Sequence, residues 1–149
     1  MHLSRAAMLA ASLLLVCVPA APQTVILYSH VDIAEAQCVR SLVQTYDQVR
    51  TDADIRPGDP WRQTMAGWIM NARTVIVLWS AAAAASAEVA PEWRMALAAG
   101  ARVVPMMLDA TPLPPELAAR QAVNVFAAER CALLPPCLCP PLTRTMAPP

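Results

Sequence analysis

Three apolar runs, separated by segments with helical periodicity, constrain the fold of this chain more than any other feature. The runs occupy residues 24–28 (TVILY), 74–79 (TVIVLW) and 102–108 (RVVPMML). An apolar stretch of this length without polar alternation is typical of a strand buried on both faces, as in a parallel sheet. Parallel neighbours require a crossover connection, which is usually a helix. The pattern therefore predicts a small doubly wound α/β fold with a parallel sheet.

The segments between these runs supply the remaining elements. Asp32 and Glu35 have capping-box spacing at the start of a helix whose predicted apolar stripe is Val39, Leu42, Val43 and Tyr46. Asp59 is a suitable N-cap for a second helix, with Pro60 at its first position. We expect further helices at 91–99, before Gly100, and near Glu116. Short strands are expected at 49–55, as a weak edge strand, and at 122–126.

Composition excludes several classes of function. The 149 residues suffice for one domain, and eleven basic residues balance eleven acidic ones, for a formal net charge of +0. This balance argues against a nucleic-acid partner bound through a basic patch. The chain has only 3 glycines, which disfavours a glycine-rich phosphate loop, and lacks lysine, which excludes Schiff-base and Walker-type lysine chemistry.

The two ends differ from the centre. Residues 1–23 have a polar start, an apolar run at 6–18 and small residues at 19–21, which is the shape of a secretory signal. A wrongly chosen start codon gives the same pattern, and both interpretations stay open. Residues 24–127 form the predicted domain. Residues 128–149 are rich in proline and cysteine and lack a helical stripe, so we expect an irregular tail and no final helix over the sheet.

The 5 cysteines do not form a metal-binding pattern. Cys131, Cys137 and Cys139 lie among proline and leucine without a neighbouring histidine, so we expect no metal site. The odd number argues against a disulfide framework. Cys38, in the first predicted helix, is expected to be an inert buried thiol.

Five segments, in this order, resemble a bacterial Toll/interleukin-1 receptor (TIR) domain. They are VILYSHVD at 25–32, DADIRPGDPW at 52–61, NARTVIVLWS at 71–80, PEWRMALAAGARVVPMMLD at 91–109 and LPPEL at 113–117. The resemblance implies a flavodoxin-like sheet with strand order 2-1-3-4-5. It also implies one of two functions. Many bacterial and plant TIR domains cleave the bond between nicotinamide and ribose in NAD, whereas others only assemble with further TIR domains.

The resemblance places the catalytic carboxylate of such an enzyme at Glu92. NAD would be the substrate, with no separate cofactor. Loops at the carboxyl ends of the strands would surround it, because ligands of open α/β sheets bind where the strand order reverses. Glu92 lies in a first helical turn, which favours an ionised carboxylate and suits stabilisation of an oxocarbenium-like transition state. The expected substrate-binding residues are Tyr28, Ser29, His30, Arg56, Pro57, Gly58 and Ser80.

One departure from the family pattern leaves the choice of function open. Enzymatic members often carry tryptophan four residues before the glutamate, where this chain has Glu88. A second carboxylate there is expected to raise the proton affinity of Glu92. The leading hypothesis is an NAD glycohydrolase or cyclase in prokaryotic defence or virulence signalling. The alternatives are a non-enzymatic module that self-associates through the 56–59 loop, and a truncated remnant.

The expected location depends on the N-terminal segment. The family resemblance implies the cytoplasm, whereas a functional signal at 1–23 implies secretion. A membrane would be a partner only if that segment were retained as an anchor.

Overall fold

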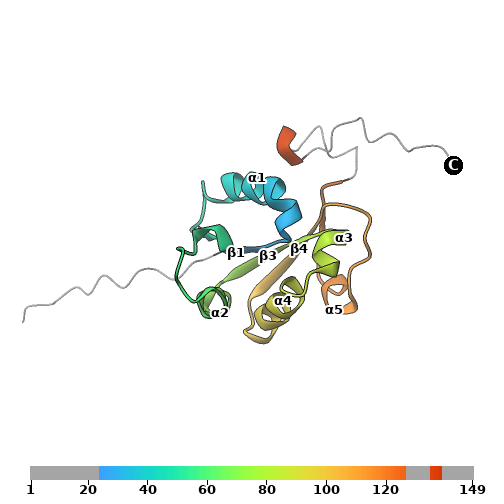
Figure 1. The fold of residues 1–149 in the computed structure, drawn as a ribbon. Coiled ribbons are helices and arrows are strands. Elements are labelled where there is room, and N and C mark those ends of the chain that lie inside the picture. Colours follow the sequence, from blue (N-terminus) through green and yellow to red (C-terminus); the bar gives the residue numbers. More distant parts are fainter. Residues whose placement is uncertain (1–23, 127–134, 139–149) are drawn as a thin grey trace, which may run out of the picture.

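The computed structural model describes residues 24–126 and 135–138, which form a five-stranded parallel sheet with helices on both faces (Figure 1). The signal-like segment and most of the predicted tail lie outside the described residues. The strand order is β2-β1-β3-β4-β5, so the predicted fold class and order are confirmed. The strands are β1 (Thr24–Leu27), β2 (Val49–Arg50), β3 (Thr74–Trp79), β4 (Arg102–Met107) and β5 (Val123–Asn124).

Helices connect the strands and cover the sheet. Figure 1 shows α1 on one face, with α2 and α4 on the other. The α-helices are α1 (Ile33–Val43), α2 (Trp61–Asn71), α3 (Ala81–Ala85), α4 (Val89–Ala98) and α5 (Pro115–Ala118). Three short 3-10 helices are η1 (His30–Asp32), η2 (Asp52–Asp54) and η3 (Pro136–Leu138). Within the described part of the chain, none of these helices combines the length and the hydrophobicity that crossing a bilayer requires.

Side-chain alternation along the central strands divides the core into two clusters. In β3, Val75 and Val77 face α2, α4 and α5, whereas Ile76 and Leu78 face α1. The first cluster contains Trp93 from α4, which is 1% exposed, and the second contains Val39 from α1. Because successive strand residues point to opposite faces, a run such as TVIVLW has to be apolar at nearly every position.

Pro105 lies inside β4, where a proline normally interrupts a ladder. The backbone N–H groups of Arg102 and Leu108 donate to the carbonyl oxygens of Arg73 and Trp79. The even-numbered residues of β4 therefore direct their backbone N–H groups toward β3, and the odd-numbered residues direct theirs toward β5. Pro105 therefore faces the β5 side, where pairing begins only at Met106. Its missing N–H removes no hydrogen bond from the β3–β4 ladder, which explains why the strand tolerates it.

The first helix is shorter than its apolar pattern predicts. α1 ends at Val43, and Leu42 and Tyr46 are 42% and 93% exposed. Val39 is buried and Val43 half-buried, so the inner half of the predicted stripe is correct and the outer half is wrong. The predicted capping box is also wrong, because the Asp32 side chain makes no capping hydrogen bond to α1. Asp32 instead bonds across the sheet edge.

The prediction that Cys38 is an inert free thiol is wrong, because Cys38 and Cys137 form a disulfide with a Cα–Cα distance of 5.9 Å. It attaches η3 to α1. Leu138 of η3 is 5% exposed and belongs to the second core cluster. Among the described residues, η3 is the only helical element that follows β5. The rest of the predicted tail lies outside the described residues, so the expected lack of a closing helix stays a prediction. An odd cysteine count does not prevent one pair from forming, and sequence spacing gave no sign that residues 99 positions apart would meet.

Ser80 connects two loops at the carboxyl edge of the sheet. Its Oγ donates to the Oδ2 of Asp32 at 2.6 Å and accepts the N–H of Ala83 at 3.0 Å, which makes it the N-cap of α3. Both side chains are buried, with Ser80 5% and Asp32 8% exposed. The pair holds the segment after β1 against the segment after β3. Burial raises the pKa of Asp32, and the hydrogen bond from Ser80 opposes that shift.

Replacing Ser80 with alanine should therefore destabilise the fold. We expect Ser80→Ala to lower the free energy of unfolding by about 2 kcal/mol, because a helix cap is lost and a buried carboxylate loses its donor. Urea denaturation followed by circular dichroism measures the change. Ser41→Ala is the matched control, because the Ser41 hydroxyl is exposed and bonds only within α1. Equal midpoints for the two variants would contradict the structural role of Ser80.

Candidate functional site

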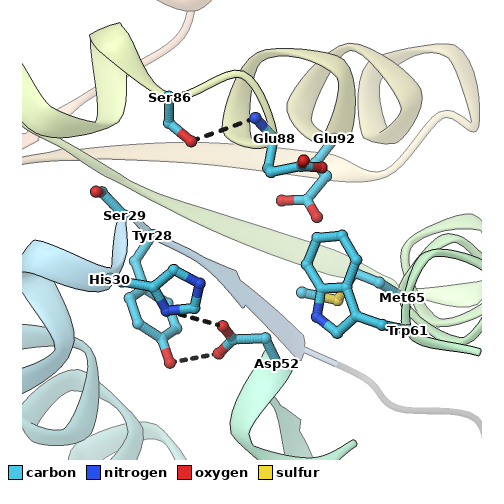
Figure 2. Close-up of a pocket in the computed structure, with 9 residues that line it drawn as sticks. All are labelled: Tyr28, Ser29, His30, Asp52, Trp61, Met65, Ser86, Glu88 and Glu92. Atoms are coloured by element: carbon cyan, nitrogen blue, oxygen red, sulfur yellow. Dashed lines mark hydrogen bonds and ion pairs between the residues drawn. The ribbon is translucent and has the colours of Figure 1, made fainter. Parts of the chain in front are cut away.

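A small cavity opens where the chain leaves β1, between η2, α2 and the start of α4 (Figure 2). Its volume is about 90 Å³. It lies beside the switch between β1 and β3, where ligands of open α/β sheets bind. The lining residues are Tyr28, Ser29, His30, Asp52, Trp61, Met65, Ser86, Glu88 and Glu92. The structure thus brings four of the predicted site residues together, namely Tyr28, Ser29, His30 and Glu92.

Asp52 organises one side of this cavity. The Tyr28 hydroxyl donates to its Oδ1, and His30 Nδ1 lies 3.6 Å from its Oδ2 (Figure 2). Burial and the adjacent Asp52 carboxylate raise the pKa of Tyr28, so the phenol stays a hydrogen-bond donor. The His30 side chain is 83% exposed and covers the cavity from the solvent side. Asp52 is thus an acidic neighbour of His30 that comes from a different loop.

The loop that carries Asp52 is fixed by its own capping box. Thr51 is the N-cap of η2, and its backbone N–H donates to the Oδ2 of Asp54 at 2.9 Å. Arg40 of α1 holds both ends of the turn, because it reaches the Asp54 carboxylate at 2.7 Å and the Thr51 hydroxyl at 3.2 Å. The Thr51–Asp54 spacing is a capping-box pattern. That pattern was the available sequence signal for a turn here, and the predicted strand over 49–55 obscured it.

Glu92 supplies the carboxylate on the opposite side. It lies in the first turn of α4 and points into the cavity toward Trp61 (Figure 2). Burial raises the pKa of Glu92 to about 7, with smaller contributions from the charges of Glu88 and Asp52. The predicted influence of Glu88 is therefore confirmed in direction. The helix N-terminus favours the ionised form, but burial and two acidic neighbours outweigh it.

Glu88 immediately precedes α4 and has its own partner. Its Oε1 accepts a hydrogen bond from Arg62 of α2 at 2.9 Å, in an ion pair whose side chains are 45% and 79% exposed. Such an exposed pair contributes little to stability. It does fix the Glu88 carboxylate at the mouth of the cavity, across from the aromatic residues of α2.

Trp61 and Met65 form the apolar wall. Both also line a second cavity of about 160 Å³, which continues between α2 and α4 and shares Glu88 and Glu92 with the first. Trp61 has the spacing of a core residue along α2, but the structure places it on this wall. Trp79 is buried as predicted, with 6% exposure, and Trp68 packs against the same core cluster.

The other predicted site residues lie outside both cavities. Arg56, Pro57 and Gly58 are exposed on the loop before α2, and Ser80 is the buried cap described above. Gly58 has a φ of +95°, a conformation that favours glycine and explains its place in the turn. Among residues 24–126 and 135–138, no three His, Cys, Asp or Glu side chains are placed so that they could hold a metal ion together.

The site can therefore bind a flat cationic group and stabilise positive charge. Three carboxylates, Asp52, Glu88 and Glu92, line a cavity with one aromatic wall. A cation that entered would lower the pKa of Glu92 and favour its ionised form. The volume admits a single ring, because sites that enclose a whole drug-sized molecule have about 300 Å³ or more.

Comparisons with known proteins agree with this architecture. The family model described as "TIR domain" matches residues 25–134. Among solved structures, the TIR domain of the Toll-related receptor TRR-2 from Hydra magnipapillata is similar, with a TM-score of 0.64 and 15% identity over 75% of this chain and 90% of that one. A TIR-STING receptor from C. gigas, solved with 2',3'-cGAMP, gives a TM-score of 0.61 and 20% identity over 81% of this chain.

These likenesses differ in scope. This chain spans 40% of the C. gigas receptor chain, and at such low identities both structures establish the fold alone. No curated protein matches the sequence significantly. Both similar structures come from animals, so the bacterial origin implied by the sequence resemblance stays a prediction. The family model, the strand order and the site at the β1–β3 switch lead to one conclusion: this chain belongs to the TIR domain family.

Proposed function

We propose that this TIR domain cleaves the bond between nicotinamide and ribose in NAD, with Glu92 as the catalytic carboxylate. The observation that carries the proposal is the position of Glu92, a partly buried acid in a carboxylate-lined cavity at the β1–β3 switch. In this proposal the reaction serves a signalling pathway in prokaryotic defence or virulence.

The chemistry follows from the charges around the cavity. As the bond breaks, its electron pair leaves with nicotinamide, and positive charge develops on the ribose ring. An ionised Glu92 beside the anomeric carbon would stabilise that charge more in the transition state than in the substrate. Water then adds to the ribose and releases a proton, which gives ADP-ribose; attack by a group within the same molecule gives a cyclic product instead.

In this proposal the other residues of the cavity bind the nicotinamide and ribose end of NAD. Trp61 offers an aromatic face to the nicotinamide ring, and the Asp52 cluster offers hydrogen-bond acceptors to ribose hydroxyls. Because the cavity volume is about 90 Å³, the adenine end would remain outside it. The exposed Arg56 is the predicted partner for the pyrophosphate, since guanidinium groups match phosphate oxygens.

Replacing the Glu92 carboxylate with its neutral isostere tests the proposed reaction. We expect Glu92→Gln to reduce nicotinamide release from NAD by about 100-fold or more, because charge stabilisation of the transition state is lost. Chromatography of the products, at several protein concentrations, measures the rate. Glu116→Gln, a change at an exposed acid on α5, is the control and should retain full activity. Equal rates for wild type and Glu92→Gln would remove Glu92 from the mechanism.

The raised pKa of Glu92 also predicts how stability depends on pH. The folded protein holds a proton at Glu92 up to about pH 7, whereas the unfolded chain releases it near 4.5. Proton binding therefore favours the fold below pH 4.5, and this contribution is lost as the pH rises through 7. We expect Glu92→Gln to melt roughly 5 °C above wild type at pH 8, and at nearly the same temperature at pH 4.

Calorimetry at the two pH values measures this difference. Glu116→Gln serves again as the control, and its melting temperature should follow that of wild type at both. A Glu92→Gln variant no more stable than wild type at pH 8 would contradict the raised pKa. A broad, uncooperative transition in wild type would instead favour the truncated remnant.

The alternative function is a scaffold that assembles with other TIR domains. The favouring observation is the loop before α2, whose residues 56–60 are all exposed and lie apart from both cavities. Because their side chains are exposed in the described part of the chain, these residues are available to another copy. This proposal needs no NAD turnover, and the Arg62–Glu88 pair beside the loop is equally compatible with it.

Self-association through this loop has a direct test. We expect Arg56→Ala to weaken concentration-dependent association by about tenfold, because an interfacial charge is lost, while the melting temperature stays unchanged. Sedimentation velocity over a concentration series measures the association. Arg120→Ala, at an exposed arginine near β5, is the matched control. Association without nicotinamide release would favour the scaffold; unchanged association in Arg56→Ala would remove the loop from the interface.

A further inference from the structure

We propose that residues 135–138 form a redox-released clasp on the α1 face of the sheet. In the oxidised protein, the Cys38–Cys137 disulfide holds this segment against α1, and Leu138 completes the second core cluster. Reduction of the disulfide releases the segment and uncovers that face. The proposal concerns the α1 face of the sheet, not the Glu92 cavity at its edge, and does not depend on NAD cleavage.

Leu138 occupies a position that the fold needs to fill. It is 5% exposed and packs in a cluster with Ile26 of β1, and Ile76 and Leu78 of β3. The half-buried Met106 and Leu108, at the end of β4, pack against the same cluster. α1 is the only α-helix that contributes to this cluster among the described residues, so Leu138 covers sheet surface that would otherwise face water.

Among the described residues, few interactions other than the disulfide and the packing of Leu138 hold this segment in place. η3 is one turn of three residues, and its one intrasegment backbone hydrogen bond runs from the Leu138 N–H to the Pro135 carbonyl. Burial of a single leucine is a small gain against the conformational entropy of ordering four residues. The disulfide lowers the entropic cost of docking Leu138, because it already holds the neighbouring Cys137 against α1. Without the disulfide, docking would have to close a long loop.

The length of the closed loop makes the cross-link effective. Cys38 and Cys137 are 99 residues apart, so the bond joins the first helix to the far end of the domain. A disulfide that closes a long loop removes more conformational freedom from the unfolded chain than one that closes a short loop. The oxidised protein should therefore be more stable than the reduced one, and more compact on this face.

The release step needs a dithiol reductant. A thiolate of the reductant attacks one sulfur of the disulfide, which forms a mixed disulfide and frees the other cysteine as a thiolate. The second thiol of the reductant then displaces the remaining cysteine, which leaves Cys38 and Cys137 as thiols and the reductant as a cyclic disulfide. A disulfide oxidant reverses the sequence. The clasp is thus closed in oxidising surroundings and open in reducing ones.

Melting the full chain with and without dithiothreitol tests the clasp. We expect dithiothreitol to lower the melting temperature of wild type by roughly 10 °C, and Cys137→Ser to reproduce that value without it. Cys139→Ser and Cys131→Ser are the matched controls and should keep the response to the reductant. An unchanged melting temperature in wild type, or loss of the response in a control variant instead of Cys137→Ser, would overturn the pairing.

Leu138→Ala tests the docking separately, because this variant keeps both cysteines. It should lower the melting temperature of the oxidised protein by several degrees and leave the reduced protein nearly unchanged. Leu117→Ala, at a residue of α5 that is 0% exposed in the first core cluster, should destabilise both forms equally. An equal loss in both forms for Leu138→Ala would show that the segment stays docked without the disulfide. No loss in either form would show that it does not dock; either result overturns the proposal.

Discussion

The parallel pairing of β1 with β3 is the constraint on which the rest of the structure depends. In the sheet, β1 lies between β2 and β3. The chain therefore turns to one side after β1 and to the other side after β3, and the loops that leave these two strands diverge. Tyr28 and His30 come from the first loop, and Ser80 begins the second. The buried bond between Ser80 and Asp32 keeps these loops in register. The space between two such loops can hold a ligand while the hydrophobic core below stays fully packed.

The electrostatics of the cavity result from competition between local and tertiary effects. A glutamate in the first turn of a helix is expected to be ionised, and sequence position alone predicts this for Glu92. The fold then buries the residue beside Glu88 and Asp52, from segments 4 and 40 positions away, and its pKa rises to about 7. A proton held that weakly near neutral pH can be displaced by a cationic ligand. Burial thus makes the carboxylate responsive to the charge of what enters the cavity.

The sequence predicts the strands and helices that have a local periodic pattern. It does not predict contacts between segments that are far apart in the chain. Apolar runs identify β1, β3 and β4, because a strand buried on both faces has a composition of its own. Asp52 escapes prediction because its partners, Tyr28 and His30, lie on another loop. Trp61 has core spacing on α2, yet it lines a cavity because α4 leaves a gap opposite it. No pattern within α1 or around Cys137 indicates that the two would meet.

Two chemically distinct regions occupy different parts of this domain. The Glu92 cavity lies at the carboxyl edge of the sheet, between Met65 of the first core cluster and Tyr28, which packs against the second, whereas the disulfide and Leu138 belong to the side of the second cluster alone. α1 is the element that reaches both, because Cys38 forms the disulfide and Arg40, two residues on, holds the η2 turn that carries Asp52. A displacement of α1 would therefore act on the Asp52 side of the cavity before it reached Glu92. Because the Asp52 carboxylate contributes to the raised pKa of Glu92, such a displacement would also reach the carboxylate on α4, through Asp52.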